Sequence, residues 1–126
     1  MAQTAEDVAN EVGLPAEELS KPCDNQNISL LADCFSEWRV IFASLLSNVD
    51  LSDVTRENES EKERRRAALR KWKGSNGSGA TYKVLVSALL DNGEKDQAEV
   101  LCRILAKQLR QRQAGGYHDS SRFSLI

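Results

Sequence analysis

Residues 80–101 read ATYKVLVSALLDNGEKDQAEVL, and this stretch decides the fold. Its first half places apolar side chains at the i, i+3, i+4 and i+7 spacing of an amphipathic helix. These side chains are Tyr82, Leu85, Val86 and Leu89. The pair Asn92-Gly93 ends that helix, because both residues tolerate positive φ, and a second helical period starts near Lys95.

The same spacing predicts four helices upstream. The first begins behind a cap at Asn27, the second follows Ser36, the third is a short element capped by Asp50, and the fourth starts at Asn58 or Ser60. The fourth helix, SEKERRRAALRKWK, has a narrow apolar stripe and is expected on the surface. Six helices without a convincing strand pattern predict an all-α fold, an antiparallel helical bundle.

The flanks differ from the bundle in composition, so we expect one domain over residues 27–113. Residues 1–26 hold few large apolar side chains and form an N-terminal flank, in which a capping box over residues 4–7 allows a short helix. Residues 114–126 are rich in Gly and Ser and are expected to form a flexible C-terminal tail. Residues 74–79, GSNGSG, are expected to form a mobile loop.

The composition indicates a soluble globular protein. The chain has 126 residues, of which 40 % are hydrophobic and 29 % charged, values typical of one folded domain. Its apolar runs are far shorter than the roughly 20 residues that a membrane-spanning helix needs. The acidic N-terminus lacks the basic start and apolar stretch of a signal peptide. We therefore expect a cytoplasmic protein without membrane insertion.

The residues of catalytic or metal sites are scarce in this sequence. Cys23, Cys34 and Cys102 lack the paired C-x-x-C spacing of a zinc site, and we expect reduced thiols. The one histidine, His118, stands in the C-terminal tail without a partner for nucleophilic or general-base catalysis. We expect the chain not to be an enzyme and to use no cofactor, metal or small-molecule substrate.

Charge is unevenly spread along the chain, although the formal net charge is only −2. The predicted fourth helix carries a basic patch, formed by Arg64, Arg65, Arg66, Arg70 and Lys71. The turn between the fifth and sixth helices carries an acidic patch, formed by Asp91, Glu94, Asp96 and Glu99. Opposite patches on one small domain can meet head to tail, so both are candidate partner-binding surfaces.

Residues 28–105 resemble the death domain family in three places. First, Trp38 opens the second helix, where that family usually has a tryptophan. Second, residues 69–72, LRKW, are similar to the family's leucine-x-x-tryptophan near the end of its fourth helix. Third, residues 80–99 contain A-T-x-x-x-L, A-L, G and D-x-A-E in the order and spacing of the family's final helices.

The resemblance implies the six-helix Greek key of the death fold. We expect its structural core to contain Trp38, Phe42, Leu69, Trp72, Leu85, Leu89 and Leu101. The resemblance also implies a non-enzymatic module that associates with itself or with other death-domain proteins and assembles apoptotic or inflammatory signalling complexes. This sequence departs from the family in a short, polar third helix and a very basic fourth helix, which leaves the choice of partner open.

Two other kinds of binding are considered. The basic fourth helix could contact phosphates and make the chain a nucleic-acid-binding domain, but the negative net charge and the lack of an aromatic stacking platform oppose this alternative. The last residues, Ser124-Leu125-Ile126, resemble the carboxyl terminus that PDZ domains bind by strand addition.

Overall fold

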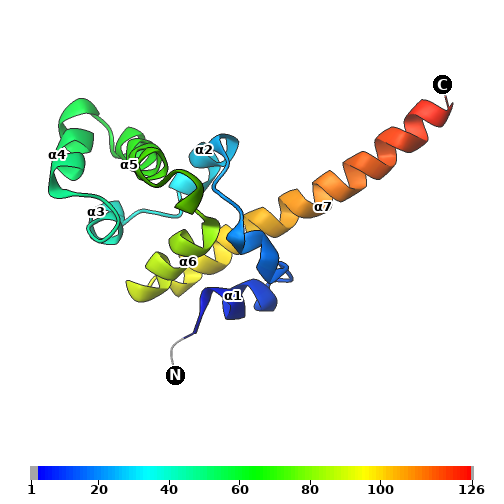
Figure 1. The fold of residues 1–126 in the computed structure, drawn as a ribbon, viewed down its shortest axis with the longest axis horizontal. Coiled ribbons are helices and arrows are strands. Elements are labelled where there is room, and N and C mark those ends of the chain that lie inside the picture. The colour runs from blue at the N-terminus through cyan, green and yellow to red at the C-terminus, as the bar shows by residue number, and fades with distance from the viewer. Residues whose placement is uncertain (1–2, 126) are drawn as a thin grey trace.

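The computed structural model describes residues 3–125, with side chains described from residue 3 to residue 113. In this part of the chain the structure has seven α-helices and no strand (Figure 1). They are α1 (Ala5–Glu11), α2 (Ile28–Ala32), α3 (Trp38–Phe42), α4 (Asn48–Glu57), α5 (Glu61–Asn76), α6 (Tyr82–Asp91) and α7 (Lys95–Leu125). Short 3₁₀ turns occupy Ala16–Ser20, Asn25–Asn27 and Gly77–Gly79. The predicted all-α fold is confirmed.

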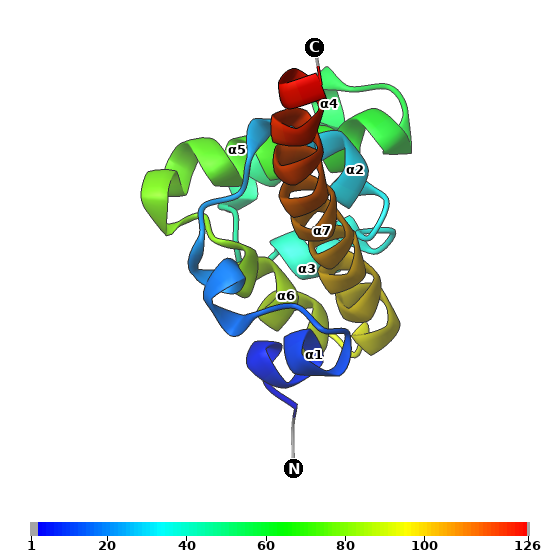
Figure 2. The ribbon, with the colours of Figure 1, turned by 90° about the vertical axis from the view of Figure 1, so that its right-hand side faces the viewer.

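Helices α6 and α7 lie side by side and run antiparallel (Figures 1 and 2). Gly93 makes the turn between them at φ 74°, a left-handed value that favours glycine. Helix α5 packs against α2 and α4, and α3 contacts both α5 and α6. Helix α6 therefore lies between α7 and α3, because it contacts both helices.

Serine side chains begin two of the helices. Ser60 Oγ accepts a hydrogen bond from the Glu63 N–H at 3.1 Å, so α5 starts at the second of the two expected positions. The expected cap at Asp50 is wrong. Helix α4 begins earlier, at Asn48, because Ser47 Oγ accepts a hydrogen bond from the Asp50 N–H at 3.1 Å.

The expected loop over residues 74–79 is shorter in the structure, because α5 continues to Asn76. Asn76 Nδ2 donates a hydrogen bond to the Trp72 carbonyl oxygen at 2.8 Å, and the Gly77 N–H donates one to the carbonyl oxygen of Lys73. These bonds satisfy carbonyl groups that the end of a helix leaves without partners. Gly77 then turns the chain at φ 54°.

Helix α7 continues to Leu125, beyond residue 113, where the sequence predicted the helix to end. The mobility expected of residues 114–126 stays a prediction. The side chains of His118 and of the terminal Ser124-Leu125-Ile126 lie outside the described residues. Among the helices of the described chain, none is both long and apolar enough to cross a membrane.

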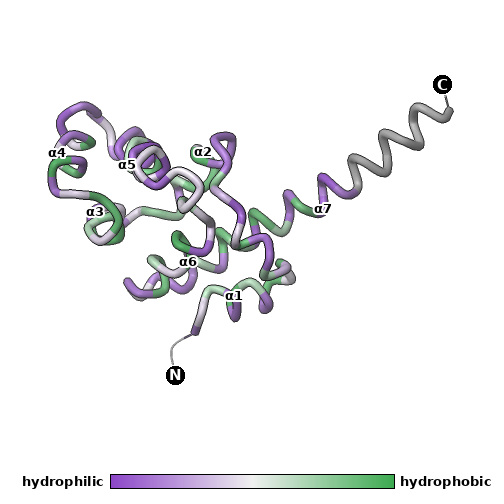
Figure 3. Tube along the Cα trace, in the orientation of Figure 1, coloured by the Kyte–Doolittle hydropathy of each residue, from purple (hydrophilic) through white to green (hydrophobic). Residues whose placement is uncertain are grey.

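The centre of the bundle is filled by aromatic and leucine side chains. The core residues expected from the sequence are each at most 1 % exposed: Trp38, Phe42, Leu69, Trp72, Leu85, Leu89 and Leu101. The rings of Phe35 and Phe42 pack 5.3 Å apart between centroids. Figure 3 shows long hydrophilic stretches on α4 and α5, whereas hydrophobic residues recur along α6 and the first half of α7. The α6–α7 pair thus supplies much of the core.

The N-terminal flank contributes to the core, which corrects the expectation drawn from its few large apolar residues. Its buried side chains, each at most 2 % exposed, are Ala5, Val8, Ala9, Leu14, Leu19 and Cys23. Helix α1 packs against α6 and α7, where its two alanines allow a close approach. The capping box over residues 4–7 is present. From the sequence we also expect residues 1–26 to be removable without loss of the fold, and this stays a prediction.

Candidate interaction surfaces

Two arginines of the basic patch are held by groups of the same chain. Arg64 donates from Nε to the Asn58 carbonyl oxygen at 2.8 Å and from Nη1 to Glu61 Oε1 at 2.9 Å. Arg66 Nη1 lies 3.5 Å from Glu63 Oε1. Both ion pairs join residues three apart on α5, so these cations are partly neutralised before any partner arrives.

The remaining members of the basic patch are Arg65, Arg70 and Lys71. Arg70 is exposed, and Arg65 and Lys71 are half-buried. Among the described side chains, none of the three forms an ion pair. The Nε atom of Arg65 is buried and has no hydrogen-bond partner among the described side chains. Arg70 and Lys71 are therefore the cations of the patch that are most available to a partner.

The acidic patch also contains both a residue held in ion pairs and residues outside them. Glu99 lies 3.9 Å from Lys95 Nζ and 3.5 Å from Arg103 Nη2, so its charge is offset along α7. Asp91 and Asp96 are exposed, Glu94 is half-buried, and none of these three pairs with a cation within the described side chains. Their carboxylates surround the α6–α7 turn and can meet cations of another molecule.

The two patches lie at different ends of the bundle. In Figures 1 and 2, which share a vertical axis, α5 lies above α6, and the α6–α7 turn lies below. One molecule cannot bring its own Arg70 against its own Asp91 in this arrangement. Two copies could do so in a head-to-tail contact, which leaves a second pair of patches open to further copies.

Glu61 joins α3 to α5 and was not singled out from the sequence. Its carboxylate accepts hydrogen bonds from Trp38 Nε1 at 2.9 Å, from Arg39 Nη2 at 3.1 Å and from Arg64 Nη1 at 2.9 Å. The Arg39 guanidinium also stacks over the Trp38 ring, 4.7 Å from its centroid. These hydrogen bonds, that of Trp38 first, lower the pKa of Glu61 from 4.5 to about 2.

Replacing Glu61 with glutamine should flatten the acid dependence of stability. A carboxyl whose folded-state pKa is lowered from 4.5 to about 2 stabilises the fold above its unfolded pKa, and this contribution is lost as the pH falls through the lower value. In urea unfolding between about pH 5 and pH 2, the parent should therefore lose more stability than Glu61→Gln. The effect is modest because solvent screens this exposed group. Glu59→Gln is the matched control, and identical slopes for the parent and Glu61→Gln would contradict the assigned role.

An open cleft of about 400 Å³ lies beside this cluster, between α3 and α4. Its lining residues are Trp38, Arg39, Leu51, Ser52, Thr55 and Arg56. Val40 and Val49, on the same two helices, are 57 % and 69 % exposed. The α3–α4 side thus combines apolar surface with two arginines, and it is a second surface that a protein partner could cover.

The cysteine thiols are buried and unreactive in this fold. Cys23, Cys34 and Cys102 are free and buried, and burial raises the pKa of each thiol to about 11. Thiolate chemistry at neutral pH is therefore disfavoured. Within the described residues, no group of three His, Cys, Asp or Glu side chains could hold a metal ion.

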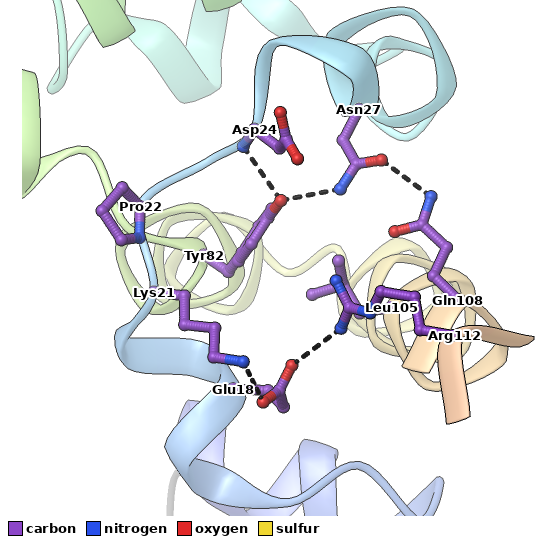
Figure 4. Close-up of a pocket in the computed structure, with 9 residues that line it drawn as sticks. All are labelled: Glu18, Lys21, Pro22, Asp24, Asn27, Tyr82, Leu105, Gln108 and Arg112. Atoms are coloured by element: carbon purple, nitrogen blue, oxygen red, sulfur yellow. Dashed lines mark hydrogen bonds and ion pairs between the residues drawn. The ribbon is translucent and has the colours of Figure 1, made fainter. Parts of the chain in front are cut away.

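A buried polar cluster connects three distant segments (Figure 4). The Tyr82 hydroxyl oxygen accepts hydrogen bonds from the Asp24 N–H at 3.0 Å and from Asn27 Nδ2 at 2.7 Å. Gln108 Nε2 donates to Asn27 Oδ1 at 2.7 Å. Asn27 was expected to cap α2, but its side chain makes no cap hydrogen bond there. It instead ties the start of α2 to α6 and α7.

A small cavity of about 90 Å³ adjoins this cluster. In Figure 4, Glu18 accepts contacts from Lys21 and from Arg112 at the edge of the cavity. The Glu18–Lys21 and Glu18–Arg112 distances are 2.6 Å and 3.2 Å. The site is large enough for a few water molecules, and its polar groups largely satisfy one another. The cavity therefore lies where the N-terminal flank contacts α7, and its polar groups have a structural role.

Comparison with known proteins identifies the family of this bundle. The model of the Death domain family matches residues 25–105, which cover α2 to α6 and the start of α7. No curated protein and no solved structure was found to match the chain. The matched range is more than half of the chain and contains the helices on which the sequence resemblance rests. The chain belongs to the death domain family.

Proposed function

We propose that this domain assembles apoptotic or inflammatory signalling complexes in the cytoplasm by docking onto itself or onto other death-domain proteins. Membership of the family makes the chain a protein-interaction module of signalling, and death domains are not enzymes. The finer proposal is carried by one observation: the available cations of α5 and the available carboxylates of the α6–α7 turn lie at different ends of one bundle.

In the proposed contact, Arg70 and Lys71 of one molecule face Asp91 and Asp96 of the next. Such complementary charges orient an encounter and add specificity more than they add bulk affinity. Arg64 is left out, because its bonds to Asn58 and Glu61 belong to the fold. The nucleic-acid alternative gains no support, since Arg64 and Arg66 already face carboxylates of α5.

Reversing Arg70 and Lys71 to glutamate should weaken self-association or partner binding at least tenfold, while the melting temperature stays nearly fixed. Like charges across an interface repel, whereas exposed charges contribute little to folding. Sedimentation at low salt measures the assembled mass. Raising the salt from about 0.15 M to about 1 M should also weaken the association of the parent protein, because the screening length falls from about 8 Å to about 3 Å.

A charge-swap pair makes this test specific. Asp91→Lys with Asp96→Lys should also abolish assembly. Mixing it with the Arg70→Glu, Lys71→Glu variant should restore association, because the unaltered basic patch of the first variant can meet the unaltered acidic patch of the second. Lys107→Glu, an exposed change on α7, is the control and should behave like the parent. If the mixture stays monomeric while the parent assembles, the contact lies elsewhere, and the α3–α4 cleft is the next surface to test.

A further inference from the structure

The segment before the family match docks onto the bundle as a strap. This N-terminal strap, residues 3–20, contains α1 and the 3₁₀ turn Ala16–Ser20, and it packs against α6 and α7. The death domain match begins only at residue 25. The face of α6 and α7 beneath the strap is therefore a surface of the family fold that this chain covers with a segment of its own.

The strap shows what chemistry fits this face. Helix α1 turns Ala5, Val8 and Ala9 inward at the i, i+3, i+4 spacing, whereas Asp7, Asn10 and Glu11 stay exposed. The inward residues are small, so the helix backbone lies close to its neighbours. Deeper anchors follow at Leu14 and Leu19, which are at most 1 % exposed.

Charge complements this apolar contact at both ends of the strap. Glu6 Oε2 lies 2.9 Å from Lys83 Nζ on α6, and Glu18 Oε1 lies 3.2 Å from Arg112 Nη2 on α7. The hydrogen bond from Lys83 lowers the pKa of Glu6. Between residues 3 and 20 the sequence has only acidic charges, at Glu6, Asp7, Glu11, Glu17 and Glu18. Each end of the strap thus sets a carboxylate against a cation of the covered face, although Asp91 lines the same shallow pocket as Glu6 and Lys83.

The helical structure of the strap depends on its docking to α6 and α7. A helix as short as α1 is not stable alone and depends on this docking. Its ion pair to Lys83 is exposed, and such pairs contribute little. Ser20 and Lys21 are exposed, whereas the next residues are fixed by hydrogen bonds from the Cys23 N–H to the Ala80 carbonyl oxygen and from the Tyr82 N–H to the Lys21 carbonyl oxygen. Ser20 is therefore the position about which the strap would leave the bundle.

We propose that the α6–α7 face beneath the strap is a docking surface for an acidic amphipathic helix of another protein, and that the strap occupies it in competition with that helix. The partner helix would lie in the apolar groove. Small apolar residues at i, i+3 and i+4 would face the groove, and a carboxylate would face Lys83. A tethered strap competes at an effective concentration on the order of mM, so the closed chain binds such a helix only weakly.

The test uses the full chain with a site-specific protease sequence inserted between Ser20 and Lys21. The probe is a fluorescent peptide of residues 3–20. After cleavage and removal of the released strap by gel filtration, the chain should bind the probe, and the uncut chain should bind it at least tenfold more weakly in fluorescence anisotropy. Circular dichroism should show that the cut chain keeps its helices.

Matched probes identify the contact. A peptide with Val8→Asp should not bind the cut chain, because the charge would enter the apolar groove. A peptide with Glu6→Lys should bind weakly to the cut parent and recover on a cut chain carrying Lys83→Glu. The proposal is overturned if the cut chain unfolds, which would make the strap an integral part of the core. It is equally overturned if the folded cut chain ignores the probe or binds it no better than the uncut chain does.

Discussion

Replacing Trp38 with alanine is expected to lower the free energy of unfolding by about 3–5 kcal/mol. The ring is 1 % exposed, and it carries the hydrogen bond to Glu61 and the stacked guanidinium of Arg39. The substitution would leave a large cavity between α3 and α5 and would remove the Trp38–Glu61 hydrogen bond that joins these helices. Such a loss is a large part of the stability of a domain of this size. Urea unfolding followed by circular dichroism measures it.

Two variants separate the contributions at this position. Trp38→Phe keeps most of the apolar packing but cannot donate to Glu61, so it should cost clearly less than the alanine. Val40→Ala, at an exposed position of the same helix, should change stability by no more than about 0.5 kcal/mol. An unchanged unfolding curve for Trp38→Ala would show that α3 does not pack into the core.

Replacing Tyr82 with alanine is expected to cost about 3–5 kcal/mol as well, for a different combination of reasons. The ring is 6 % exposed, and its hydroxyl oxygen accepts from the Asp24 N–H and from Asn27 Nδ2. Alanine would remove the ring and leave both donors without this acceptor. Tyr82→Phe isolates the polar part and should cost about 1–3 kcal/mol, the usual penalty for stranding buried polar groups.

The polar part of this effect can be measured by a double-mutant cycle. Asn27→Ala removes the donor from the side of α2, so its cost and that of Tyr82→Phe should not add when the two changes are combined. Ser29→Ala, at an exposed position of α2, is the control for thermal and urea unfolding. If the two single costs add fully, the hydroxyl of Tyr82 and the amide of Asn27 act independently, and the cluster does not couple α2 to α6.

Sequence information alone was sufficient where the determinants are local. The starts of α5, α6 and α7 and the turn at Gly93 follow from a serine cap, helical spacing and a residue that adopts positive φ, each within a few residues of the feature. The buried faces of α3 and α6 follow from the same spacing. The family resemblance over residues 28–105 rests on these local signals, and the family match over residues 25–105 agrees with it.

The remaining features depend on contacts between residues far apart in the chain. Asn27 carries the signature of a helix cap, and it became a buried link only because Gln108, 81 residues later, reaches its oxygen. Glu61 is an ordinary first-turn carboxylate until α3 brings Trp38, 23 residues earlier, against it. The small apolar residues of α1 are too few to indicate a core position, and they are buried because α6 and α7 meet above them. Side-chain types and spacings specify local conformation, whereas packing between distant segments decides which polar groups become partners and which surfaces stay open.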